Sequence, residues 1–155
     1  MAKVLYKLFL ALMLALFIGF GIAVFYTSPK APDYPVELQN KNSDQLTTAQ
    51  KAVETDFNIK QSDFQKKFAT YSRNVSAVAL GFAVILLILS LTVLVKIDII
   101  GDGALFGGLL TLGYGIIRGF MSQEAKYQFA VVTVGLLITL FLGYIKFLKP
   151  EKKKL

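Results

Sequence analysis

The sequence contains no histidine, no cysteine and no tryptophan, and only 17% of its residues are charged. Without thiols and imidazoles, cysteine nucleophiles, histidine bases and most zinc sites are excluded. The absence of cysteine also excludes disulfides, so cysteine usage does not indicate the redox compartment. We therefore expect a protein that is not an enzyme, with no catalytic residues and no cofactor-binding or metal-binding residues.

Charge is missing altogether from three long stretches of the chain. No Asp, Glu, Lys or Arg occurs from Leu8 to Pro29, from Asn74 to Val95, or from Tyr127 to Ile145. Each stretch reaches the roughly 20 residues that a helix needs to cross a bilayer. With 55% hydrophobic residues and a mean hydropathy of +0.58, the composition is typical of a membrane protein. These stretches predict three transmembrane helices.

A fourth apolar stretch, GDGALFGGLLTLGYGIIRGF at residues 101–120, is rich in glycine. It begins with Gly-x-Gly, but it follows an apolar run instead of a strand and lacks the dinucleotide-binding spacing, so we expect no nucleotide site. Its uncharged part, from Ala104 to Ile117, gives about 21 Å of helix, which is short for a bilayer. We interpret it as a transmembrane helix with Asp102 and Arg118 at the two interfaces.

The predicted fold class is therefore an all-α integral membrane protein. It has four transmembrane helices and an extracytoplasmic helical extension or hairpin between the first and the second. The expected segments are a cytoplasmic N-terminus at 1–7, transmembrane helices at 8–26, 74–95, 104–121 and 127–146, an extracytoplasmic loop at 27–73, a cytoplasmic turn at 96–103, an external turn at 122–126 and a basic cytoplasmic tail at 147–155.

The first apolar run is expected to be an uncleaved anchor. It is longer than the 7 to 15 apolar residues of a signal peptide. The bulky residues Val24, Phe25 and Tyr26 also leave no clear small-x-small cleavage site after it.

Small residues recur at every fourth position in three of the four expected helices. This spacing places them along one helix face, where small side chains let another backbone approach closely in lipid. One such row would follow from the high frequency of Gly and Ala in transmembrane helices, but three rows favour a close-packed bundle. The expected helix-packing residues are Ala11, Ala15, Gly19 and Ala23 in the first span, Gly103, Gly107, Thr111, Gly115 and Gly119 in the third, and Gly135, Thr139 and Gly143 in the fourth.

The long loop after the first span divides into two halves. Pro29, Pro32 and Pro35 require an extended or polyproline-like conformation in the first half. In the second half, apolar residues recur at helical spacing and continue in phase into the second span. This stripe consists of Leu46, Ala49, Val53, Phe57, Phe64, Phe68, Tyr71 and Val75.

Two arrangements of the helical half remain open. The helix begins at Asp44, or at Thr47 with Gln50 three residues on, and runs without a break into the second span. Alternatively it breaks near 58–61 into a hairpin, with Ser62 and Gln65 as a second capping box.

The aromatic residues of this stripe are candidate partner-binding residues. The extended segment at 33–38 contributes only three apolar side chains, which are expected to alternate toward the outer part of the helix: Tyr34, Val36 and Leu38. A contiguous apolar patch would then stay open nearer the membrane, as at interaction sites. The expected partner-binding residues are Phe57, Phe64, Phe68 and Tyr71.

Basic residues cluster at the ends of the spans, near both termini. The positive-inside bias therefore places both termini in the cytoplasm, most simply at the plasma membrane. Lys152 and Lys153 occupy the positions of eukaryotic di-lysine retrieval signals, but a basic anchor is the simpler interpretation. We expect the net charge of +7 to contact anionic lipids at the cytoplasmic face, and we expect no nucleic acid because there is no basic soluble domain.

The carboxylates Asp98 and Asp102 lie four residues apart at the entrance to the third span. They could bind a cation, and an interfacial lipid enzyme using them with a metal ion is a remote alternative. We expect instead that both are solvated carboxylates at the membrane interface, where their negative charge balances the positive charge of Lys96. No charged residue lies at the centre of a predicted span, which argues against proton-coupled transport.

Two classes of function remain. We expect a non-enzymatic accessory, assembly or scaffold subunit that binds other membrane proteins or itself. The alternative is a subunit of an oligomeric channel or small-solute transporter lined by hydroxyl and backbone groups.

Overall fold

The computed structural model describes residues 1–39 and 46–148, and within them every regular element is helical. The four long helices are α1 (Ala2–Phe25), α2 (Thr48–Thr92), α3 (Asp98–Phe120) and α4 (Ala125–Gly143). Short 3-10 turns form η1 (Val36–Leu38) and η3 (Leu94–Lys96), and a π-helical turn forms η4 (Tyr144–Leu148). All four long helices are long and apolar enough to cross a membrane. The all-α class and the four apolar helices are therefore confirmed.

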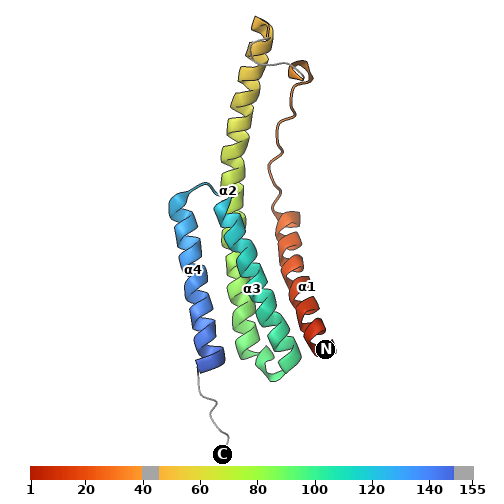
Figure 1. Cartoon of the computed structure of the whole chain (residues 1–155), viewed down its shortest axis with the longest axis vertical. Helices are drawn as coiled ribbons and strands as arrows, with labels where there is room; N and C mark the ends of the chain where they lie inside the picture. Colours follow the sequence, from red (N-terminus) through yellow and green to blue (C-terminus); the bar gives the residue numbers. More distant parts are fainter. Residues whose placement is uncertain (40–45, 149–155) are drawn as a thin grey trace, which may run out of the picture.

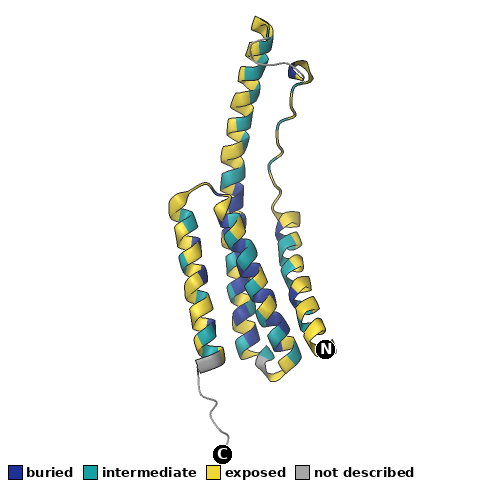
Figure 2. Cartoon of the chain, in the orientation of Figure 1, coloured by how far each residue is buried: buried dark blue, intermediate teal, exposed yellow. Residues whose placement is uncertain are grey.

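The helices are arranged so that the start of α1 and the end of α4 lie at the same end of the bundle (Figure 1). α2 and α3 pack along one another, α1 packs mainly on α3, and α4 packs more lightly on α3. Buried residues concentrate where α2 and α3 pack against one another within the bundle, whereas the outer faces of α1 and α4 are exposed (Figure 2).

α2 is one unbroken helix of 45 residues, or about 68 Å. The Thr47 hydroxyl accepts a hydrogen bond from the backbone N–H of Gln50, while the Gln50 side chain accepts one from the backbone N–H of Thr47. The predicted cap and the continuous arrangement are confirmed. The hairpin alternative is wrong, because residues 58–65 are helical throughout. The expected alternative cap, Asp44, lies outside the described residues, as does the tail from 149 onward.

The outer part of α2 projects well beyond the other helices, and the extended segment after α1 climbs beside it (Figure 1). Arg73 of α2 forms an ion pair with Glu124 in the turn between α3 and α4, so the bundle ends at this level. The 25 residues from Thr48 to Ser72 therefore extend about 37 Å past the bundle. We call residues 27–39 together with 48–72 the arm.

The extended conformation of the first half of the arm is confirmed, but the expected alternation of its side chains is wrong. Tyr34 contacts Phe57 and Leu38 is buried, whereas Val36 is 76% exposed. The cause is η1, in which three residues complete one turn, so residues two apart no longer point to the same side.

α3 begins at Asp98, six residues before the expected start of the third span, so the predicted turn at 96–103 shrinks to the residues around η3. The backbone N–H of Gly101 donates to the Ile97 carbonyl over 2.8 Å, and an acidic residue in the first turn suits the helix dipole. With 23 residues, or about 34 Å, α3 is long enough to span a bilayer.

Buried hydroxyl groups link α2 to α3. The Ser76 hydroxyl donates to the Gly115 carbonyl, and the Ser90 hydroxyl donates to the Gly101 carbonyl, each over 2.7 Å. Both serines are buried, and in lipid such interhelical hydrogen bonds add to van der Waals packing. Apolar packing near the base of the arm centres on Ile22, Tyr71, Val75 and Ala79.

Candidate functional site

The small residues of α3 face the three other long helices. All five expected packing residues of this helix are buried: Gly103, Gly107, Thr111, Gly115 and Gly119. A Cβ atom added at Gly107 would lie 3.1 Å from the Leu14 Cβ and 3.3 Å from the Ala11 carbonyl oxygen, both in α1. A Cβ atom added at Gly115 would lie 3.1 Å from the Leu80 Cδ2 of α2. A Cβ atom added at Gly119 would lie 3.1 Å from the Ser76 Oγ of α2 and 3.2 Å from the Val131 Cγ1 of α4. The row therefore drifts around α3 and contacts all three of the other long helices.

The rows of α1 and α4 pack differently from that of α3. In α1 only Ala11 is buried, while Ala15 and Gly19 are half-buried and Ala23 is exposed. In α4, Gly135 is buried against Ile116, whereas Thr139 is exposed. Cβ atoms added at Gly19 or Gly143 would meet no atom of the described residues within 4 Å. Within one copy of the chain, each of these two rows has only one buried position.

The aromatic residues of the arm pack largely against the chain itself. Tyr34 packs edge-on against Phe57 with ring centroids 5.2 Å apart, and Phe64 and Phe68 are half-buried neighbours. Tyr71 is only 6% exposed. The expectation that this membrane-proximal residue stays open is therefore wrong.

Tyr26 at the end of α1 provides the cover that the sequence reasoning missed. Its ring stacks on Tyr71 with centroids 5.0 Å apart and an interplanar angle of 14°. The Asn74 amide also donates to the Tyr26 hydroxyl over 2.9 Å. Because Tyr26 ends the first apolar run, the sequence pattern assigns it to the first transmembrane span and not to the arm.

Arg118 lies at the junction of the arm and the bundle, among tyrosines. Its Nε donates to the Tyr114 hydroxyl over 3.2 Å, and its guanidinium lies 5.6 Å from the Tyr114 ring centroid and 5.8 Å from that of Tyr71. Among the described residues, no carboxylate lies within 4 Å of this guanidinium, and nearby Glu124 pairs with Arg73. The spacing of Tyr114 and Arg118, four apart on one helix, was the available signal for this contact.

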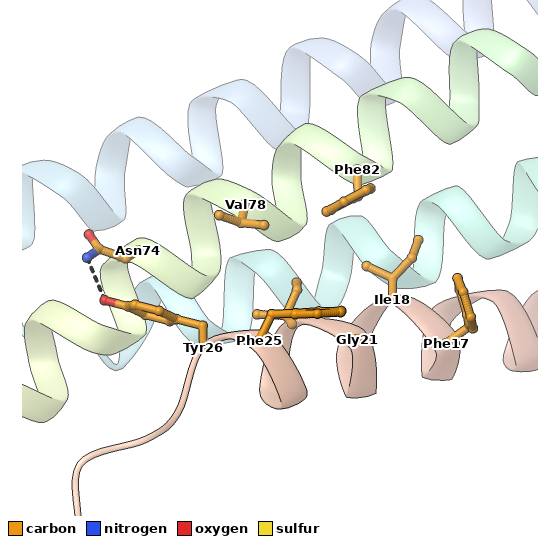
Figure 3. Close-up of a pocket in the computed structure, with 9 residues that line it drawn as sticks. Phe17, Ile18, Gly21, Phe25, Tyr26, Asn74, Val78 and Phe82 are labelled. Atoms are coloured by element: carbon orange, nitrogen blue, oxygen red, sulfur yellow. Dashed lines mark hydrogen bonds between the residues drawn. The ribbon is translucent and has the colours of Figure 1, made fainter.

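A groove of about 510 Å³ separates α1 from α2 (Figure 3). Its walls are apolar, with Phe17 and Phe25 from α1 and Val78 and Phe82 from α2. Its polar residues, Asn74 and Tyr26, lie at one end and hydrogen-bond to each other, as Figure 3 shows. The groove therefore suits an apolar occupant without selecting for a headgroup.

At the opposite end of the bundle, Asp102 joins three helical elements. Its carboxylate oxygens accept hydrogen bonds from Lys7 of α1 over 2.6 Å and from Lys146 of η4 over 2.8 Å. The three side chains are between 25% and 44% exposed. The expectation that Asp102 balances Lys96 is therefore replaced by a pairing with two other lysines. Because both oxygens are occupied by ammonium groups, Asp102 is poorly placed to bind a metal ion together with Asp98.

Further evidence for a chemical site is lacking in the part of the chain that the structure describes. Residues 1–39 and 46–148 contain no group of three or more side chains that could hold a metal ion. Comparisons with protein-family models, with curated proteins and with solved structures find no match for this chain. Function therefore has to be argued from the geometry of the arm, the junction and the helix faces.

Proposed function

We propose that this chain is a non-enzymatic accessory, assembly or scaffold subunit of a membrane complex. In this proposal the four long helices cross the plasma membrane, both termini are cytoplasmic, and the arm projects on the outer side to contact another protein. The observation that carries the proposal is the arm itself, a projection of about 37 Å on a helix that continues without a break into the bundle.

The arm is supported by its own contacts. Phe57 is covered by Tyr34, Leu38 is 4% exposed, and the Gln50 amide donates to the Glu37 carbonyl over 3.4 Å. An isolated helix of this composition is only marginally stable in water, because most helical stability in proteins comes from tertiary packing, so this cover stabilises the helical form. A preformed arm also loses less conformational freedom when a partner binds than a disordered segment would.

The face of the arm turned away from the extended segment is the proposed contact surface. Ile59 lies two positions from Phe57, about 200° around the helix, and is 64% exposed. Polar residues, including Thr55, Asn58 and Ser62, surround it on the same surface. Protein interfaces have an apolar centre surrounded by a polar rim, and Ile59 with its polar neighbours has the same organisation on a smaller scale. The aromatic residues expected to bind a partner would then act as internal supports of the arm.

Isolation from native membranes in mild detergent tests the proposal. The unmodified chain is expected to co-purify with another protein at a defined ratio. Ile59→Glu should release that protein while helicity and melting temperature remain unchanged, because Ile59 is largely solvent-exposed. Gln65→Glu, at an exposed position on another part of the helix surface, is the matched control and should retain the partner. Isolation of the unmodified chain as a lone monomer, or equal retention by both variants, would contradict the proposal.

Single-cysteine labelling tests the proposed orientation, since the native chain has no cysteine. Gln65→Cys in the arm, at an exposed position away from the proposed contact surface, should react with a membrane-impermeant reagent in intact cells. Lys3→Cys at the start of α1 should react only after permeabilisation. The reverse pattern would invert the orientation.

A further inference from the structure

A second groove runs along the outer half of α1 beside α3 and ends at Arg118. It has a volume of about 390 Å³. Its lining residues are Leu12, Ala15, Leu16, Gly19, Phe20 and Ala23 of α1 and Leu110, Tyr114 and Arg118 of α3. The groove exists because three of the α1 residues are small: a Cβ atom added at Gly19 would meet no described atom within 4 Å. Of the small residues on α1, only Ala11 therefore packs closely, whereas Ala15, Gly19 and Ala23 line this groove.

The dimensions of this groove match one half of a bilayer. The α1 wall extends from Leu12 to Ala23, which is about 16 Å of helix, and the α3 wall from Leu110 to Arg118 is about 12 Å. One leaflet accounts for about 15 Å of the roughly 30 Å hydrocarbon thickness. A volume of 390 Å³ is also within the common range for ligand pockets, about 300 to 1,000 Å³. An acyl chain lying parallel to the helices would follow the groove over most of its length.

Arg118 supplies a headgroup site at the arm-side end of the groove. Arg118 is a half-buried residue. Its guanidinium contacts Tyr114 and Tyr71 and has no described carboxylate within 4 Å. A partly desolvated cation near a membrane interface requires an anion, and a guanidinium matches the paired oxygens of a phosphodiester. The α1–α2 groove offers no such charge, because none of its lining residues is charged.

We propose that the α1–α3 groove binds one acidic phospholipid from the leaflet on the arm side, with its phosphate on Arg118 and an acyl chain along Ala15, Gly19 and Ala23. The lipid completes the packing between α1 and α3 where their side chains leave space. This site is separate from the protein-contact surface of the arm, so it stands whether or not the accessory role is correct.

Native mass spectrometry of the purified full chain tests this site, with phosphatidylglycerol added in detergent and phosphatidylcholine as the comparison lipid. Gly19→Leu fills the proposed groove. Gly21→Leu is the matched control, because it lies on the same helix, lines the α1–α2 groove instead, and likewise has no described atom within 4 Å of an added Cβ. Arg118→Gln removes the headgroup contact without shortening the side chain greatly.

The unmodified chain and Gly21→Leu are expected to retain one phosphatidylglycerol in preference to phosphatidylcholine. Gly19→Leu and Arg118→Gln should each weaken this retention about tenfold, which corresponds to about 1.4 kcal/mol. Inorganic phosphate at millimolar concentration should not displace the lipid, because the acyl chain contributes to binding. Equal retention by Gly19→Leu and Gly21→Leu would overturn the groove assignment, and unchanged retention by Arg118→Gln would overturn the headgroup assignment. A change of oligomeric mass in Gly19→Leu without a change in lipid retention would assign the groove to a second copy of the chain and also overturn the proposal.

Discussion

Replacement of Gly107 by alanine gives the most direct test of close packing between α1 and α3. The added Cβ would lie 3.1 Å from the Leu14 Cβ and 3.3 Å from the Ala11 carbonyl oxygen. A Cβ atom and a backbone oxygen cannot be moved by a rotamer change alone, so the α1 backbone would have to shift. Overpacking of this kind typically costs about 1 to 3 kcal/mol.

Gly113 provides the matched control on the same helix. It also lies inside α3, but an added Cβ there would meet no described atom within 4 Å. In both variants the change from glycine to alanine favours the helix by up to about 1 kcal/mol, so the propensity term cancels in the comparison. The difference in stability between Gly113→Ala and Gly107→Ala therefore isolates the packing cost.

Thermal unfolding in one detergent, followed by circular dichroism, measures this difference. Gly113→Ala should unfold at or above the temperature of the unmodified chain, and Gly107→Ala should be less stable than Gly113→Ala by about 1 to 3 kcal/mol. Leucine at the two positions should widen the gap, because the space beside Gly113 is open, whereas α1 packs directly against Gly107. Equal unfolding temperatures for the two alanine variants would refute the packing of α1 on α3.

Two further comparisons test polar contacts. Ser76→Ala removes the buried hydrogen bond to the Gly115 carbonyl and should destabilise the chain by about 0.6 to 1.7 kcal/mol in a denaturation assay. Ser72→Ala should be neutral or stabilising, because the buried Ser72 hydroxyl has no described hydrogen-bond partner. A larger loss of stability for Ser72→Ala than for Ser76→Ala would contradict the α2–α3 contact. Asp102→Asn breaks two partly exposed lysine pairs and should lower stability by about 1 kcal/mol, while Asp98→Asn at an exposed position should have little effect, as compared by thermal unfolding at low salt. Equal effects of the two asparagine variants would show that the lysine pairs contribute nothing.

Most of the helical framework follows from local patterns in the sequence. Uncharged stretches of about 20 residues predict three of the four helices, and a shorter glycine-rich stretch predicts the fourth. The in-phase apolar stripe predicts that α2 continues from the arm into the bundle. Thr47 and Gln50 mark its start because a capping box depends only on residues three apart. Each of these features depends on residues that are near one another in the chain.

The contacts between distant residues could not be predicted in the same way. Tyr26 stacks on Tyr71 and Lys7 pairs with Asp102, in each case across tens of residues. Which face of α1 meets α3 depends on how the two helices diverge, so the row through Ala15 and Gly19 opens into a groove although its spacing matches that of a packing face. Small-residue spacing shows where a helix could be approached, but not what approaches it.

A photo-crosslinking amino acid at Ile59 in native membranes is the sharpest test of whether the arm contacts another protein. We expect a covalent adduct larger than the chain itself, formed only on illumination. The same amino acid at Phe57, which Tyr34 covers, should crosslink within the chain and leave its mass unchanged. An adduct at neither position, or an intermolecular adduct at Phe57 without one at Ile59, would contradict the account.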